Sequence, residues 1–163
     1  MTKQEALDRI KELEKFIKET DKKKEWVWKP KEGENYWAIR NDGGIAWCEW
    51  KDSPHEEMIY STGNIFKTEE EAEQHLDWLE ARAKILRDVE EKNGGRKVDW
   101  NGFGQYKYEI YYNYNDETLK VYTAYEAQSL PAGMAYLNKK DAEASMKDLR
   151  NEWLIFFGVK EDK

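Results

Sequence analysis

One stretch of this sequence occurs twice at a constant register, and it constrains the fold more than any other feature. Each copy has a glycine, an aromatic residue, a helix-capping residue and then an acidic-Ala-Glu helix start. The matching positions are Gly63 and Gly133, Phe66 and Tyr136, Thr68 and Asn138, and Ala72 and Ala142. Because one offset relates all four pairs, the sequence predicts a tandem repeat of one small module.

Each copy of the stretch follows a predicted β-hairpin and opens a predicted helix. In the first repeat, residues 36–40 and 45–50 alternate as strands around an Asn-Asp-Gly-Gly turn, and Met58-Ile59-Tyr60 is a candidate third strand. In the second repeat, residues 106–114 and 118–125 form the corresponding hairpin. Thr68 and Asn138 cap the two helices, and the first helix ends at Asn93-Gly94-Gly95.

The predicted core faces of these helices follow from their apolar spacing. On the first helix the stripe is Ala72, Leu76, Leu79, Ala83 and Leu86, widened by Ile85 and Val89. On the last helix the core face is Ala142, Met146, Leu149, Trp153 and Phe156.

A further amphipathic helix is predicted at the N-terminus, over residues 2–20. Thr2 and Glu5 have capping-box spacing, and one narrow stripe carries Ala6, Ile10, Leu13 and Ile17. Such a seam needs a partner, which is either the rest of the chain or a second copy in a homodimer.

The sequence therefore predicts an α+β protein. An N-terminal helix (1–24) precedes a first ββ(β)α repeat (25–93), a Gly-Gly linker (94–97) and a second ββ(β)α repeat (98–160). We expect each small antiparallel sheet to cover its own helix. We also expect the repeats to pack together, because a unit of about 65 residues buries little core alone.

Composition narrows the classes of function. The net charge of −7 argues against direct nucleic-acid binding and leaves open a basic protein surface as partner. The single cysteine, Cys48, excludes an internal disulfide, and no apolar run approaches the about 18 residues of a membrane span. We expect a cytoplasmic protein without a membrane segment.

No motif in the sequence indicates an enzyme, a metal or a cofactor. His55 and His75 have no second histidine or cysteine at the spacing of metal ligands. Cys48 lies in a predicted strand of alternating pattern and has no evident catalytic partner. Gly102-Phe103-Gly104 lacks the strand-before, helix-after context of a phosphate-binding loop and is assigned to a turn.

Aromatic residues are in surplus, with 8 Trp and 10 Tyr. Tryptophan commonly fills the core of a small domain, but aromatics here occur on both faces of the predicted strands. Tyrosine and tryptophan also dominate the binding hot spots of protein interfaces. We therefore predict a partner-binding surface that includes Trp37, Trp47, Trp50 and Tyr111.

Two segments resemble a known group of proteins. The stretch from Trp28 to Trp37, with its Trp-Lys-Pro-Lys-Glu-Gly-Glu-Asn-Tyr-Trp sequence, and the stretch from Gly63 to Ala72 are similar to a module of small uncharacterised proteins from phages and prophages of Gram-positive bacteria. Residues 108–159 resemble a companion module of the same proteins. The group has no settled activity, so the resemblance implies a mobile-element origin and no catalytic residue.

Two functions follow as hypotheses. The first is a non-enzymatic phage protein that binds a host protein through an acidic, aromatic surface and inhibits a host defence system, in the manner of an anti-CRISPR protein. The alternative is a small-ligand or nucleotide-binding protein, a sponge, with an aromatic pocket between the repeats.

Overall fold

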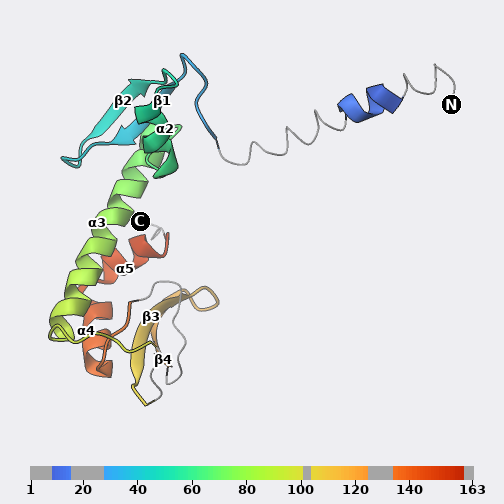
Figure 1. Cartoon of the computed structure of the whole chain (residues 1–163). Helices are drawn as coiled ribbons and strands as arrows, with labels where there is room; N and C mark the ends of the chain where they lie inside the picture. Colours follow the sequence, from blue (N-terminus) through green and yellow to red (C-terminus); the bar gives the residue numbers. More distant parts are fainter. Residues whose placement is uncertain (1–8, 16–27, 101–103, 125–133, 160–163) are drawn as a thin grey trace. The chain divides into compact units, whose positions relative to one another are not determined.

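The structure is a computed structural model that describes residues 9–15, 28–100, 104–124 and 134–159 (Figure 1). It is mixed α+β, with two antiparallel sheets of two strands each in the described residues. The chain divides into two compact units, Met1–Ala72 (unit 1) and Glu73–Lys163 (unit 2). Residues 9–15 are helical, and the rest of the predicted N-terminal helix (1–24) lies outside the described residues.

The first predicted hairpin is confirmed in unit 1. Strands β1 (Asn35–Ile39) and β2 (Ile45–Glu49) pair antiparallel, with Trp37 opposite Trp47. Gly43 has a φ of +80° in the turn, a conformation that suits glycine, and the Asp42 carboxylate accepts the Gly44 N–H at 3.0 Å.

The predicted third strand at residues 58–60 is wrong, because these residues belong to helix α2 (Pro54–Ser61). Ser53 caps α2: its hydroxyl accepts the Glu56 N–H, and the Glu56 carboxylate accepts the Ser53 N–H at 2.9 Å. Pro54 occupies the first helical turn, where its missing N–H costs nothing. A reciprocal capping box of this kind favours a helix over an extended segment.

In each hairpin the first strand also pairs, through a single β-bridge, with a residue further along the chain. Trp37 and Phe66 exchange two backbone hydrogen bonds of 2.9 Å, each N–H donating to the other's carbonyl. Tyr108 and Tyr136 form the same reciprocal pair in unit 2, also at 2.9 Å. In both units a two-stranded sheet is thus extended by one bridge just before a capped helix.

The long helix α3 (Glu69–Lys92) begins and ends where the sequence predicts. Thr68 Oγ1 accepts the Glu71 N–H at 3.2 Å, and the Glu71 carboxylate accepts the Thr68 N–H at 3.3 Å. Gly94 and Gly95 follow the last turn with positive φ, the usual conformation at a helix C-terminus.

Unit 2 contains the second predicted hairpin, β3 (Lys107–Asn113) and β4 (Thr118–Ala124), and the helices α4 (Lys139–Asp148) and α5 (Arg150–Phe156). The final helix was expected to be continuous, but Leu149, with φ −113° and ψ 32°, separates α4 from α5. The Asn138 side chain accepts the Lys140 N–H at 3.0 Å and caps α4, as predicted.

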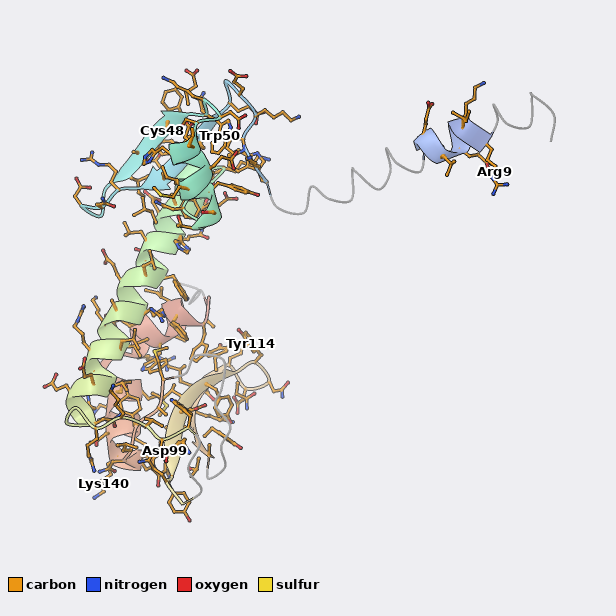
Figure 2. All side chains as sticks on the ribbon, in the orientation of Figure 1. Arg9, Cys48, Trp50, Asp99, Tyr114 and Lys140 are labelled. Carbon is orange, nitrogen blue, oxygen red and sulfur yellow. The ribbon has the colours of Figure 1, made fainter. Side chains whose placement is uncertain are left out.

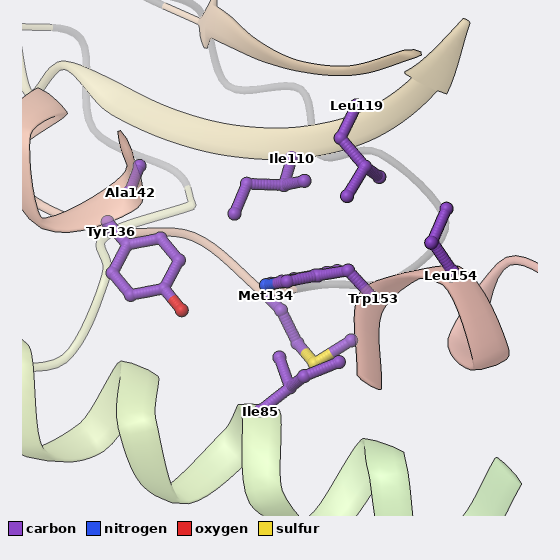
Figure 3. Packing of buried hydrophobic residues seen from close by; sticks show 8 residues of the cluster. All are labelled: Ile85, Ile110, Leu119, Met134, Tyr136, Ala142, Trp153 and Leu154. Carbon is purple, nitrogen blue, oxygen red and sulfur yellow. The ribbon is translucent and has the colours of Figure 1, made fainter. Parts of the chain in front are cut away.

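The core of unit 2 joins all of its elements (Figure 3). It consists of Ile85 from α3 together with Ile110, Leu119, Met134, Tyr136, Ala142, Trp153 and Leu154. The predicted stripe of α3 is confirmed at Ala72 and Ile85, which are buried. Leu79 and Leu86 are instead 40% and 37% exposed, and Ala81, outside the predicted stripe, is buried.

The domain boundary also differs from the expectation. The division into compact units falls between Ala72 and Glu73, inside α3, and not at residues 94–97. The physical reason is that Ile85 and Val89 of α3 pack with the second hairpin, so the C-terminal half of this helix contributes to the core of unit 2.

Candidate protein-binding surface

The outer face of the first hairpin, here called the tryptophan face, consists of Trp37, Ile39, Ile45 and Trp47. Alternation along the strands puts these four side chains on one side of the sheet, with Trp37 directly opposite Trp47 and Ile39 opposite Ile45. Trp47 is 60% exposed and Trp37 is half-buried. A large exposed aromatic beside further apolar residues is typical of an interaction surface.

Phe66 lies beside β1, and β2 forms the opposite edge of the sheet. Trp37 directs its N–H and C=O toward Phe66, away from β2, so the Trp37–Trp47 pair is a non-hydrogen-bonded pair of the antiparallel ladder. By the same alternation Ile45, Trp47 and Glu49 direct their backbone groups outward. No strand among the described residues pairs with this edge.

A groove of about 1000 Å³ lies on the other side of the hairpin, where residues of β1, the turn and β2 face α2. Its strand side carries the small side chains of Ala46 and Cys48, and its helix side carries His55, Met58 and Ile59. Met58 is 57% exposed. The groove stays open because the small side chains at the strand edge do not reach across to the helix.

Glu56 fixes one end of this arrangement. Its carboxylate accepts the backbone N–H of Lys51 at 3.0 Å and of Ser53 at 2.9 Å, so it joins the end of β2 to the start of α2. The hydrogen bond from the Ser53 backbone, followed by further bonds from the Ser53 hydroxyl and Lys51, lowers the pKa of Glu56. The carboxylate is thus ionised and engaged at neutral pH.

Burial raises the pKa of Tyr36 to about 12, and the neighbouring Cys48 and Glu56 add to the rise. Tyr36 lies opposite Cys48 across the ladder, on the groove side of the sheet. Its phenol is therefore neutral at physiological pH, and the side chain is buried at the base of the groove.

Trp50 lies in the core, contrary to its predicted place in the binding surface. It is 1% exposed and packs edge-on against Tyr36, with ring centroids 5.9 Å apart, and against Tyr60 at 6.5 Å. The Lys29 ammonium lies 5.3 Å from the centroids of Trp50 and Tyr60 and pairs with Glu57. Figure 2 labels Trp50 and Cys48 on this part of unit 1. Trp50 supports the hairpin from within and presents no surface to a partner.

Tyr111, the fourth predicted contact, is half-buried on β3 of unit 2, opposite Lys120. It therefore belongs to a different sheet from Trp37 and Trp47. Of the four predicted residues, the hairpin of unit 1 brings only Trp37 and Trp47 together at a surface.

The two histidines occupy different surroundings. His75 stacks on Trp78 at 5.8 Å, and Trp78 stacks in turn on Phe156 at 5.8 Å. His55 is exposed at the groove. In the described ranges no cluster of three or more histidine, cysteine or acidic residues could hold a metal ion.

Sequence reasoning missed the helical wall of the groove, including Met58 and Ile59. A signal was present, because Ser53-Pro54-His55-Glu56 has the spacing of a capping box with proline in the first turn. The groove also depends on the small side chain of Ala46. The sequence alone does not show that α2 lies across from Ala46, so the importance of this small side chain could not be predicted.

Comparison with protein-family models, with curated proteins and with solved structures gave no match. Across the part of the chain that the structure describes, each helix is too short or too polar to cross a lipid bilayer.

Proposed function

We propose that this chain is a non-enzymatic protein-binding module whose contact surface is centred on the first hairpin. The observation that carries the proposal is Trp47, 60% exposed and directly opposite Trp37 on the edge strand of a small sheet. Burial of such an indole at an interface contributes much of the affinity in known complexes. Trp37, Ile39 and Ile45 would complete the contact.

The partner class follows from charge and from the resemblance of the sequence. The net charge of −7 favours a basic protein surface, because complementary charge speeds encounter and disfavours wrong partners. The similarity to phage and prophage modules points to a host protein in the bacterial cytoplasm. Our leading candidate is a defence nuclease complex, whose nucleic-acid channel is basic, and the chain would then be an anti-CRISPR-like inhibitor.

We also propose that the chain contains two copies of one ancestral module, residues 25–93 and residues 98–160. Support comes from the matching bridges Trp37–Phe66 and Tyr108–Tyr136 and from the capped helix that follows each bridge. The N-terminal helix would then be an addition to the repeat, with its apolar seam available for a homodimer.

Affinity capture from a bacterial lysate tests the binding surface. We expect the wild-type chain to retain a stoichiometric protein, identified by mass spectrometry, and the Trp47→Ala variant to lose it. Tyr114→Ala is the matched control, because Tyr114 is an exposed aromatic at the end of the second hairpin. Equal retention by Trp47→Ala and the wild type would remove the tryptophan face from the proposal. Release of a small ultraviolet-absorbing compound on denaturation would favour the sponge instead.

A further inference from the structure

We infer that β2 is the docking edge for an extended peptide segment of the partner, which adds to the sheet as a new strand. Alternate side chains of this segment would enter the groove between β2 and α2. The inference rests on the proposed function and names the chemistry of the partner.

The backbone of β2 has a row of donors and acceptors that point away from β1. The backbone N–H and C=O of Trp47 point away from β1. This is because the opposite residue, Trp37, forms its backbone hydrogen bonds with Phe66 and none with Trp47. Ile45 and Glu49, two residues to either side, share this orientation. Each of the three offers one donor and one acceptor along the edge of the sheet, and the structure that satisfies such a row is another strand.

The length of the edge is limited at both ends. Beyond Glu49, the next outward N–H belongs to Lys51, and the Glu56 carboxylate accepts it at 3.0 Å. Before Ile45, Gly44 closes the turn by accepting the Arg40 N–H at 2.7 Å. The added strand therefore spans a short segment, matched to the residues Ile45–Glu49.

The groove sets the side-chain pattern of the occupant. Residues of an added strand opposite Ile45, Trp47 and Glu49 would point to the tryptophan face, and the residues between them would point into the groove. There they would meet Ala46 and Cys48 of β2 and Met58 and Ile59 of α2. A groove of about 1000 Å³ with these walls accepts apolar side chains at alternate positions.

Charge and fit argue for a different protein as the occupant and against a second copy of this chain. A second β2 would place its own small side chains, Ala46 and Cys48, over the groove and leave it unfilled. It would also bring together two chains of net charge −7. The occupant we assign is an extended, net-basic segment with apolar residues at every second position.

Selection of peptides against the full chain provides the test. Peptides of about seven residues, the length of a short strand, are selected from a displayed random library and the best are synthesised. We expect alternating apolar and basic residues, and slower hydrogen exchange at the amides of Ile45, Trp47 and Glu49 when the peptide is bound. The amides of Ala46 and Cys48 already face β1 and should change little. A library that gives no binder, or binders that protect none of these three amides, overturns the inference.

A pair of variants isolates the backbone contribution. Glu49→Pro removes an outward N–H and leaves the ladder with β1 intact, whereas Glu49→Ala removes only the side chain. We expect Glu49→Pro to weaken peptide binding about tenfold relative to Glu49→Ala, the effect of losing one hydrogen bond. Equal affinities of the two variants overturn the inference.

N-methylation of the peptide gives an independent readout if Glu49→Pro does not fold. Methylation at successive positions should weaken binding with a period of two, because alternate amides face β2. A scan without this period overturns strand addition. If the lysate partner is still lost in Trp47→Ala, docking on the tryptophan face stands and only the strand is excluded. Concentration-dependent protection of the same amides in the peptide-free chain would identify a second copy as the occupant and also overturn the inference.

Discussion

At the residue scale, the hydroxyl of Tyr136 in unit 2 joins two other polar side chains. It lies 2.7 Å from Asp88 Oδ2 and 2.6 Å from Ser145 Oγ, and Ser145 Oγ also accepts the Trp153 indole N–H at 3.1 Å. A tyrosine hydroxyl has one proton, which it donates to the Asp88 carboxylate. Burial raises the pKa of Asp88, but hydrogen bonds from Lys92, Tyr136 and Ser145 outweigh burial and lower it overall.

Tyr136→Phe should therefore destabilise the chain by about 1–3 kcal/mol at pH 7, because a charged, partly buried acceptor loses its donor. The folded pKa of Asp88 lies below its ordinary value of 3.8, so this stabilisation is fully present above that pH. It is lost as the pH falls through the folded pKa. The difference in unfolding free energy between wild type and variant should accordingly shrink below about pH 3.8 in urea titrations.

Tyr108→Phe is the matched control, since Tyr108 packs against the same core and its hydroxyl makes no hydrogen bond within the described ranges. We expect it to change stability little at any pH. A Tyr136→Phe deficit that is constant between pH 7 and pH 2 would contradict the role assigned to ionised Asp88.

At the element scale, short helix α2 depends on its cap because it has few turns of its own. The Ser53 hydroxyl accepts the Glu56 N–H at 3.4 Å and donates to the Glu56 carboxylate at 2.9 Å. This capping box holds the helix against the end of β2 and so keeps one wall of the groove in place.

Ser53→Ala should cost about 1 kcal/mol of local stability and speed amide exchange in α2 about fivefold, because the helix loses its N-terminal acceptor. Ser53→Thr keeps a hydroxyl at the same position and should leave the exchange rates close to those of the wild type. Hydrogen exchange followed by NMR distinguishes the two variants. Identical rates in Ser53→Ala and Ser53→Thr would show that the cap does not hold α2.

At the scale of the whole molecule, the two units have separate cores. Trp50, Tyr36 and Ala38 are the buried residues of one, and the cluster around Ile85 is the other, with no residue in common. Separate cores of this kind are expected to open as separate cooperative units.

Ile85→Ala should remove about 2–5 kcal/mol from unit 2 and speed exchange in β3 and β4, while the amides of β1 and β2 change little. Trp50→Ala should have the reverse pattern, because its side chain is buried in unit 1. Hydrogen exchange with mass spectrometry locates each effect. If both variants accelerated exchange equally in the two hairpins, the chain would unfold as one cooperative unit.

Local chemistry was readable in the sequence. Asn-Asp-Gly-Gly between two alternating runs predicted the first hairpin, and Thr68 with Glu71 predicted the start of α3, because turns and caps depend on residues a few positions apart. Trp37 and Trp47 could be proposed as contacts from composition and alternation. The Ser53-Pro54 cap was equally local, and its signal was overlooked in favour of the β-forming residues 58–60.

Tertiary structure decided what local pattern could not. Leu79 and Ile85 are both apolar residues of α3, yet one is exposed and the other lies in the core of unit 2. Trp47 and Trp50 are three residues apart at the end of one hairpin, and only contact with Tyr36 and Tyr60 buries the second. The groove likewise exists because α2 lies across from Ala46, a relation between distant positions. The sequence by itself determined which elements form, since propensity, caps and turns act over a few residues. Burial and the open edge of β2 depend on which elements meet, and that is a property of the folded chain.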